Sequence, residues 1–171
     1  MKILIKEAKI IDSSSKHNGK ICDILINNNK IEKIAKKIQI DSETKIFKSD
    51  NLHISQGWLD MHVNFGQPGF EQRETIENGL NVAAKGGYTE VLLMPNTNPS
   101  IDNSSMIDFI KSFSKKHIVN IQVAGNLTMN QEGKNIVEIH DMTKNGCIAF
   151  TDDKKSIQNN ELMKIALLYM K

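Results

Sequence analysis

The sequence has little cysteine, no long apolar run and no marked excess of charge of either sign. Its two cysteines, Cys22 and Cys147, lie far apart and form neither a CxxC pair nor a disulfide framework, which predicts free thiols in a reducing cytosol. No stretch approaches the ~20 apolar residues of a membrane span, and the start lacks the apolar core of a signal peptide. We therefore expect a cytoplasmic protein with no membrane partner.

The charge balance and the missing motifs exclude further classes of protein. Lys and Arg number 22 and Asp and Glu number 20, so the net charge of +2 gives no reason to expect a nucleic-acid partner. No GxGxxG or GxxxxGK pattern follows the first buried-type strand, and nucleotide binding is not supported. With 39% hydrophobic and 25% charged residues, the composition is that of a globular protein.

The pattern of apolar residues changes near residue 56. Residues 1–55 read as a small β-sheet domain, in which short alternating strands are separated by polar turns. Residues 56–171 read instead as strand followed by helix, four times over. The strands of the first part are expected at 2–11, 21–27, 30–34 and 45–48. Those of the second part are expected at 58–65, 90–94, 119–124 and 147–150, and its helices at 75–85, 104–116, 135–144 and 160–170.

The later strands are continuously apolar, which predicts burial on both faces and hence a parallel sheet of the α/β class. Two architectures fit this order, an open doubly wound sheet and a (β/α)₈ TIM-type barrel. A full barrel needs about 250 residues, so four βα units would form only its first half. Because the chain also stops inside the apolar segment 162–170, we expect a partial chain, a fragment of a longer protein.

The segment richest in candidate functional groups, Asp60 to Gly69, begins at the C-terminal end of the first of these strands. His62 and Asn64 are two residues apart, so on a strand they point to the same side, which in a barrel is the catalytic mouth. Imidazole is a good zinc ligand, whereas the neutral amide of Asn is a poor one. A lone His is more often structural, so spacing alone leaves metal binding by His62 open. The other histidines, His17, His53, His117 and His140, are expected at the surface.

Several motifs together resemble the dihydroorotase family of the amidohydrolase superfamily. The most specific is Met94-Pro95-Asn96-Thr97-Asn98-Pro99 with Asp102-Asn103; Gly57-Trp58-Leu59-Asp60-Met61-His62, Pro68-Gly69, Glu74-Thr75-Ile76, Gly86-Gly87-Tyr88-Thr89 and Phe150-Thr151-Asp152-Asp153 also match. The resemblance covers nearly the whole chain but only the N-terminal portion of the family's length. It implies the first half of a zinc-dependent barrel, preceded by a small accessory β-domain.

The resemblance also implies a reaction and a set of site residues. The reaction is the reversible closure of carbamoyl aspartate to dihydroorotate, a cyclic amide of pyrimidine biosynthesis. By position, His62 would be the first metal ligand, either Asp152 or Asp153 a bridging ligand, and Asn96 a substrate-binding residue, with Asn64 beside it. The metals would activate a bridging water and polarise the scissile carbonyl. No catalytic residue is assigned, because the family's later ligands and catalytic aspartate would lie beyond residue 171.

Two departures from the family pattern fall within one short window. Asn64 stands where the second His of the His-x-His metal motif is expected, and Gly66 stands where an Arg would clamp the substrate carboxylate. Losing a bidentate Arg costs about 2–5 kcal/mol of carboxylate binding by analogy with other buried charge pairs. The zinc site is therefore expected to be weakened or lost.

Three functional hypotheses follow from these observations. The first is a dihydroorotase-type cyclic amidohydrolase whose activity is impaired. The second is a catalytically inactive homologue that acts as a structural partner of aspartate carbamoyltransferase. The third is a different α/β binding module with an accidental match, which the Met94 to Asn103 stretch makes improbable. A small-molecule substrate, aspartate carbamoyltransferase and a second copy of the chain are thus the partners to consider.

Overall fold

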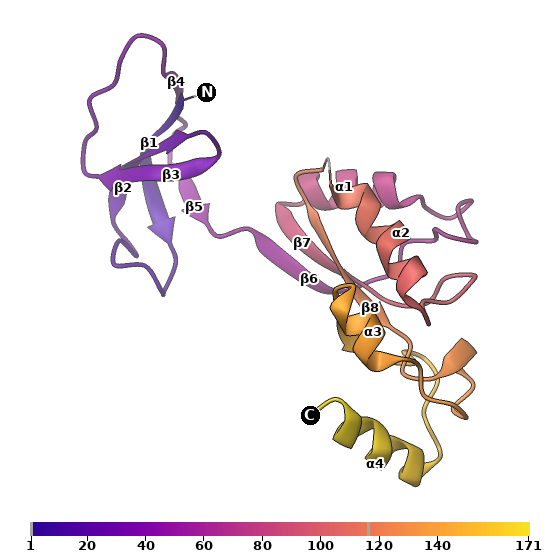
Figure 1. Cartoon of the computed structure of the whole chain (residues 1–171). Helices are drawn as coiled ribbons and strands as arrows, with labels where there is room; N and C mark the ends of the chain where they lie inside the picture. The colour runs from indigo at the N-terminus through magenta and orange to yellow at the C-terminus, as the bar shows by residue number, and fades with distance from the viewer. Residues whose placement is uncertain (1, 116) are drawn as a thin grey trace. The chain divides into compact units, whose positions relative to one another are not determined.

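A computed structural model describes residues 2–115 and 117–171. The chain divides after Gln56 into two compact units, each of which is described by itself (Figure 1).

The first unit is a five-stranded sheet made of β1 (Lys2–Ile11), β2 (Ile21–Asn27), β3 (Lys30–Ala35), β4 (Lys45–Phe47) and β5 (His53–Ser55). Its strand order is β3-β2-β1-β4, and β5 also pairs with β1. The β1–β2 and β2–β3 pairs are antiparallel, while β4 and β5 run parallel to β1. Four of these strands were predicted from the sequence, whereas the three-residue β5 was not.

A buried carboxylate ties the first unit together. Asp23 is almost fully buried and accepts hydrogen bonds of 3.0 Å from the backbone N–H groups of Glu7 and Ile38. The two bonds hold β1 and the segment after β3 to the carboxyl group of β2. Small apolar clusters complete the interior of this unit: Leu4, Leu25 and Ile38 form one, and Ile10, Cys22 and Ile24 form another.

The second unit is a four-stranded parallel sheet with helices between the strands (Figure 1). The strand order β6-β7-β8-β9 follows the chain, so this part belongs to the α/β class with a parallel sheet, as predicted. A short 3₁₀ turn, η1 (Met129–Gln131), lies before α3. The elements in chain order are β6 (Trp58–Val63), α1 (Ile76–Lys85), β7 (Tyr88–Leu93), α2 (Ser104–Ser114), β8 (Asn120–Gly125), α3 (Ile139–Lys144), β9 (Cys147–Phe150) and α4 (Asn160–Tyr169).

Side-chain caps fix where three of the helices begin. Thr75, Asn103 and Asn159 each accept a hydrogen bond from the backbone N–H three residues later, at the start of α1, α2 and α4 respectively. Such caps satisfy N–H groups that the helix itself leaves unpaired. Helix α1 ends where the sequence predicted, at Gly86, and Gly87 follows with a φ of 85°.

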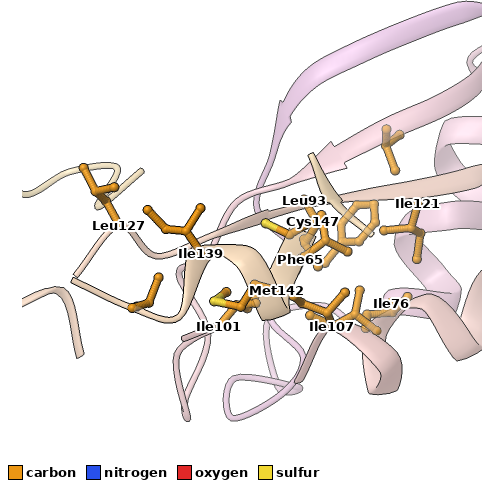
Figure 2. Close-up of a cluster of buried hydrophobic side chains, with 14 of the residues drawn as sticks. Phe65, Ile76, Leu93, Ile101, Ile107, Ile121, Leu127, Ile139, Met142 and Cys147 are labelled. Atoms are coloured by element: carbon orange, nitrogen blue, oxygen red, sulfur yellow. The ribbon is translucent and has the colours of Figure 1, made fainter. Parts of the chain in front are cut away.

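The core of the second unit lies between the sheet and its helices. Residues Leu93 and Ile121 of the strands pack with Ile76, Ile107 and Met142 of the helices (Figure 2). The opposite face of β7 and β8 forms a second apolar cluster with Leu92, Met94 and Ala124. Both faces of the C-terminal halves of these two strands are therefore buried, which explains the apolar runs Val91-Leu92-Leu93 and Val123-Ala124.

The prediction of two-sided burial is wrong for β6. Trp58 and Met61 have exposed fractions of 59% and 68%, and β6 is an outer strand that pairs only with β7 in the described chain. The strand also ends at Val63 rather than at Phe65. An apolar run alone does not show whether a strand lies inside a sheet or at its edge.

Two helices also differ from their predictions. Helix α2 was expected at 104–116 and is defined over Ser104–Ser114. Its buried residues are Ile107 and Ile110, Met106 and Phe113 pack partly buried against the core, and Phe109 is 41% exposed. Helix α3 begins at Ile139 rather than at 135, because Ile136 forms an isolated β-bridge with Thr128.

The cysteines and the helix lengths bear on two further expectations, free thiols and the lack of a membrane span. Cys22 and Cys147 are both buried free thiols, as predicted. In the described part of the chain, no helix has the length and apolar content to cross a membrane.

Candidate functional site

Four polar side chains meet beyond the carboxyl end of the parallel sheet. His62 lies in β6 and Asn64 just after it, Asn96 follows β7, and Asp153 follows β9. We call His62, Asn64, Asn96 and Asp153 the polar cluster. In parallel α/β sheets this end carries the ligand sites, so the cluster is the main candidate for function.

Hydrogen bonds join all four members of the polar cluster. His62 Nε2 lies 2.9 Å from Asp153 Oδ1, and Asn96 Nδ2 lies 2.7 Å from Asn64 Oδ1. Asn96 Nδ2 also donates to Asp153 Oδ2. Because a carboxylate only accepts, the amide atom of Asn96 that faces Asp153 must be the nitrogen, which fixes the orientation of this side chain.

Asp153 is the charged centre of the polar cluster. Its side chain is 12% exposed, against 56% for His62. Burial raises the pKa of the Asp153 carboxyl, but hydrogen bonds from Asn96 and His62 and the charges of His62 and Lys154 outweigh it, so the pKa lies below its ordinary value. Its backbone N–H donates to Thr151 Oγ1 at 2.9 Å, and its φ of 47° is in the left-handed region. The carboxylate is therefore held in its ionised form.

The neighbouring Asp152 has different partners. Its side chain is buried, and Oδ1 accepts hydrogen bonds of 2.9 Å from the backbone N–H groups of Leu127 and Thr128. The hydroxyl of Thr128 donates to Oδ2. Of the two aspartates between which the sequence left the choice open, Asp153 lies in the polar cluster and Asp152 holds the segment after β8. Thr128 was not singled out in the sequence, since no local pattern shows which hydroxyl a distant carboxylate contacts.

Gly66 lies in a tight turn of the loop that follows β6. The N–H of Gly66 donates to Glu74 O at 3.0 Å, and the N–H of Phe70 donates to Gly66 O at 2.7 Å. A Cβ atom at Gly66 would lie 2.1 Å from the carbonyl oxygen of Phe70. The turn as it stands therefore has no space for the Arg that the family pattern places there.

The same loop packs on the segment that carries Asn96. Asn98 donates its backbone N–H to Pro68 O at 3.0 Å, and a Cβ at Gly69 would lie 2.2 Å from Asn98 O. Gly69 has a φ of 94°, which an L-residue with a side chain adopts only with strain. These contacts tie the Pro68-Gly69 turn to the segment that carries Asn96.

The ligands available for a metal in the polar cluster are few. His62 and Asp153 are of the type that zinc prefers, whereas Asn64 and Asn96 offer neutral amide oxygens. Across residues 2–115 and 117–171, no group of three or more His, Cys, Asp or Glu side chains is close enough to hold a metal ion. Two strong ligands do not complete a zinc site, which takes at least three from protein in its catalytic form. The described residues alone therefore do not fit this metal.

The remaining histidines lie outside the polar cluster. His53 Nδ1 contacts Asn51 O at 2.8 Å, and His117 Nε2 contacts Asn81 Oδ1 at 3.3 Å. His53 and His140 are exposed, and His17 and His117 are partly exposed. None of the four strengthens the ligand set.

Comparison with known proteins identifies related sequences. A model of the dihydro-orotase-like family matches residues 52–169. A dihydroorotase of Clostridioides difficile (strain 630) is 37% identical over 169 residues, which cover 99% of this chain and 40% of the relative. One of Aquifex aeolicus (strain VF5) is 36% identical over 168 residues, covering 98% and 39%. The chain thus spans about two fifths of the length of these curated relatives.

Solved structures show the same fold at lower identity. An L-hydantoinase (dihydropyrimidinase) of Arthrobacter aurescens matches with a TM-score of 0.72 and 20% identity, over 86% of this chain and 32% of that one. A dihydroorotase crystal structure matches with a TM-score of 0.58 and 15% identity, over 87% and 41%.

Proposed function

This chain belongs to the dihydro-orotase-like family, and we propose that it forms the N-terminal part of an impaired cyclic amide hydrolase of the dihydroorotase type. The observation that carries the proposal is the polar cluster. Side chains from three separate strand ends, His62, Asn96 and Asp153, meet at the end of the sheet where such enzymes bind substrate.

The architecture that we propose for the longer protein is a (β/α)₈ barrel. The four parallel strands β6 to β9 would be its first half, and the sheet β1 to β5 an accessory domain. The consecutive order of the strands and the apolar clusters on both faces of β7 and β8 support this, because barrel strands are buried on both sides.

We propose that the metal site is weakened or lost in this chain. The zinc that the family uses would activate water and polarise the substrate carbonyl when bound. His62 and Asp153 would supply only two of its ligands, fewer than the three that a zinc site takes, while Asn64, at the position of a histidine, instead accepts a hydrogen bond from Asn96. Asn96 is thereby oriented by its hydrogen bonds to Asn64 and Asp153.

The substrate class in this proposal is a small cyclic amide such as dihydroorotate, in pyrimidine biosynthesis. Impairment follows from two positions. Gly66 supplies no cation for a substrate carboxylate, and Asn64 supplies no imidazole. Each loss removes a charge-assisted or coordinating contact that the family pattern provides.

A second candidate function is that of an inactive structural partner of aspartate carbamoyltransferase. The observation that favours it is that the members of the polar cluster are bonded to one another, with too few strong ligands among the described residues for zinc. In a homologue that keeps only the fold, the side chains of this site can bond to one another, because none of them has to bind a metal or a substrate.

The experiment that separates these functions measures bound zinc and hydrolysis of dihydroorotate with the longer protein whose N-terminal part this chain is proposed to form. The first function predicts zinc that His62→Ala removes, and slow turnover that falls with it. His140→Ala, which changes an exposed histidine outside the polar cluster, should change neither. Absence of both zinc and turnover, with co-purification of aspartate carbamoyltransferase, would establish the second function.

A further inference from the structure

The residue before Asn96 is bonded to the loop that joins β8 to α3. In this loop, Gln131 Nε2 donates to the carbonyl oxygen of Pro95 at 3.1 Å. That oxygen only accepts, so the Gln131 atom that faces it must be the amide nitrogen. The Pro95 carbonyl and the Asn96 N–H belong to one planar peptide unit. The bond from Gln131 therefore fixes the orientation of the peptide plane to which the Asn96 Cα is attached.

Gln131 is itself held in place by its surroundings. Its amide nitrogen also donates to Asn126 Oδ1 at 3.1 Å, so both of its N–H groups have acceptors. Asn126 is fully buried, and its Nδ2 donates to Ser100 Oγ at 2.8 Å. The φ of Gln131 is 57°, in the left-handed region that a glutamine adopts only with strain. A strained backbone and a fully bonded amide indicate a side chain with one fixed position.

The same loop also holds the residue before Asp153. The buried carboxylate of Asp152 accepts hydrogen bonds from the backbone N–H of Thr128, at 2.9 Å, and from its hydroxyl. Thr128 O in turn accepts the backbone N–H of Gln131 at 3.0 Å. One turn of the chain is thus bonded to the residue before Asn96 and to the residue before Asp153, and these two side chains bond to each other.

We infer that Gln131 is a positioning residue, which holds the Pro95 carbonyl and so keeps Asn96 at hydrogen-bond distance from Asp153. The contacts that carry the inference all lie within residues 95–153 of the described chain. It rests on the proposed function in one respect, since that function makes Asn96 a substrate-binding residue. A residue that only stabilised the fold would protect the core and Asn96 alike, and this difference can be measured.

The test measures how fast the side-chain N–H protons of Asn96 exchange with water, by NMR of the longer protein whose N-terminal part this chain is proposed to form. Gln131→Met removes the donor with little change in side-chain length. Exchange at Asn96 should become about two- to tenfold faster, as for the loss of one hydrogen bond, while that of the backbone N–H of buried Ile121 should stay the same. Gln131→Lys keeps a donor at similar reach and should restore slow exchange.

Glu132→Gln is the matched control, because it changes an exposed side chain of the same turn, one that pairs with Lys134. It should leave exchange at Asn96 as it is. Unchanged exchange at Asn96 in Gln131→Met overturns the inference, and so does a rise of equal size at Asn96 and Ile121. Fast exchange that persists in Gln131→Lys also overturns it. The proposed function fails separately, through the absence of zinc and turnover in the unsubstituted protein, whatever the exchange rates are.

Discussion

Asp152 and Asp153 are adjacent in the chain, but their carboxylates lie in different surroundings. Asp152 accepts hydrogen bonds from the backbone of Leu127 and Thr128 inside the protein, whereas Asp153 contacts His62 and Asn96 at the end of the sheet. One carboxylate therefore stabilises the fold, and its neighbour is available for function.

This difference predicts opposite effects of the same substitution. Asp152→Asn should lower the free energy of unfolding by about 1–3 kcal/mol, because an amide group cannot accept all the hydrogen bonds that the buried carboxylate accepts. Asp153→Asn should lower it less, because its carboxylate contacts side chains at the end of the sheet, and it should reduce any zinc binding. Urea unfolding of both variants, with zinc titration of each, checks this. A larger loss of stability in Asp153→Asn would contradict the assignment.

The lowered pKa of Asp153 predicts a contribution to stability that depends on pH. Burial alone would raise the pKa, but contacts with Asn96 and His62 lower it below the ordinary carboxyl value of 3.8. A depressed pKa in the folded state gives stability that is present above the unfolded value and is lost as pH falls through the folded one. His62→Ala should therefore raise the pKa of Asp153, measured by NMR titration of its carboxyl carbon. An unchanged pKa would show that His62 is not its partner.

The turn at Gly66 predicts that restoring the family's arginine does not restore the site by itself. Gly66→Arg places side-chain atoms against the Phe70 carbonyl, so the loop must change its path, at a cost of about 1–3 kcal/mol. The control is Gly86→Ala, where the nearest atom to a Cβ is 3.2 Å away in the Tyr88 ring and φ is −77°. Chemical unfolding should show a lower free energy of unfolding for Gly66→Arg and an unchanged one for Gly86→Ala. An unchanged value for Gly66→Arg would mean that the loop already has space for the side chain.

The core assignment predicts a contrast between two isoleucines. Ile107 is fully buried on α2, whereas Ile118 is 82% exposed. Ile107→Ala should lower the free energy of unfolding by about 2–5 kcal/mol through lost burial and the cavity that remains. Ile118→Ala should have little effect, because its side chain is already in water. Similar losses in the two variants would be inconsistent with α2 packing through Ile107.

The sequence indicated the strand–helix order because apolar periodicity and turn residues are local features. The range of β9 was predicted residue for residue, and Gly86 marked the end of α1. It did not indicate that β6 and β9 are the outer strands of the sheet in the described chain, and β6 was expected to be buried although Trp58 is not. Edge position depends on which strands are present to pair, which no single segment shows.

For the candidate site, the sequence predicted the participants but not their contacts. His62, Asn64 and Asn96 were selected by motif and spacing, and they do lie together with Asp153. The choice between Asp152 and Asp153 required the long-range bonds to Leu127 and Thr128. The bond between Asn64 and Asn96 joins residues 32 positions apart, so no local pattern contains it.

The most direct test of the account is a zinc titration of the purified chain followed by NMR. If the polar cluster is what remains of a metal site, zinc should shift the His62 ring nitrogen and the Asp153 carboxyl while leaving the Asp152 carboxyl unchanged. Zinc that perturbs Asp152, or that binds as tightly after His62→Ala and Asp153→Asn together, would contradict it.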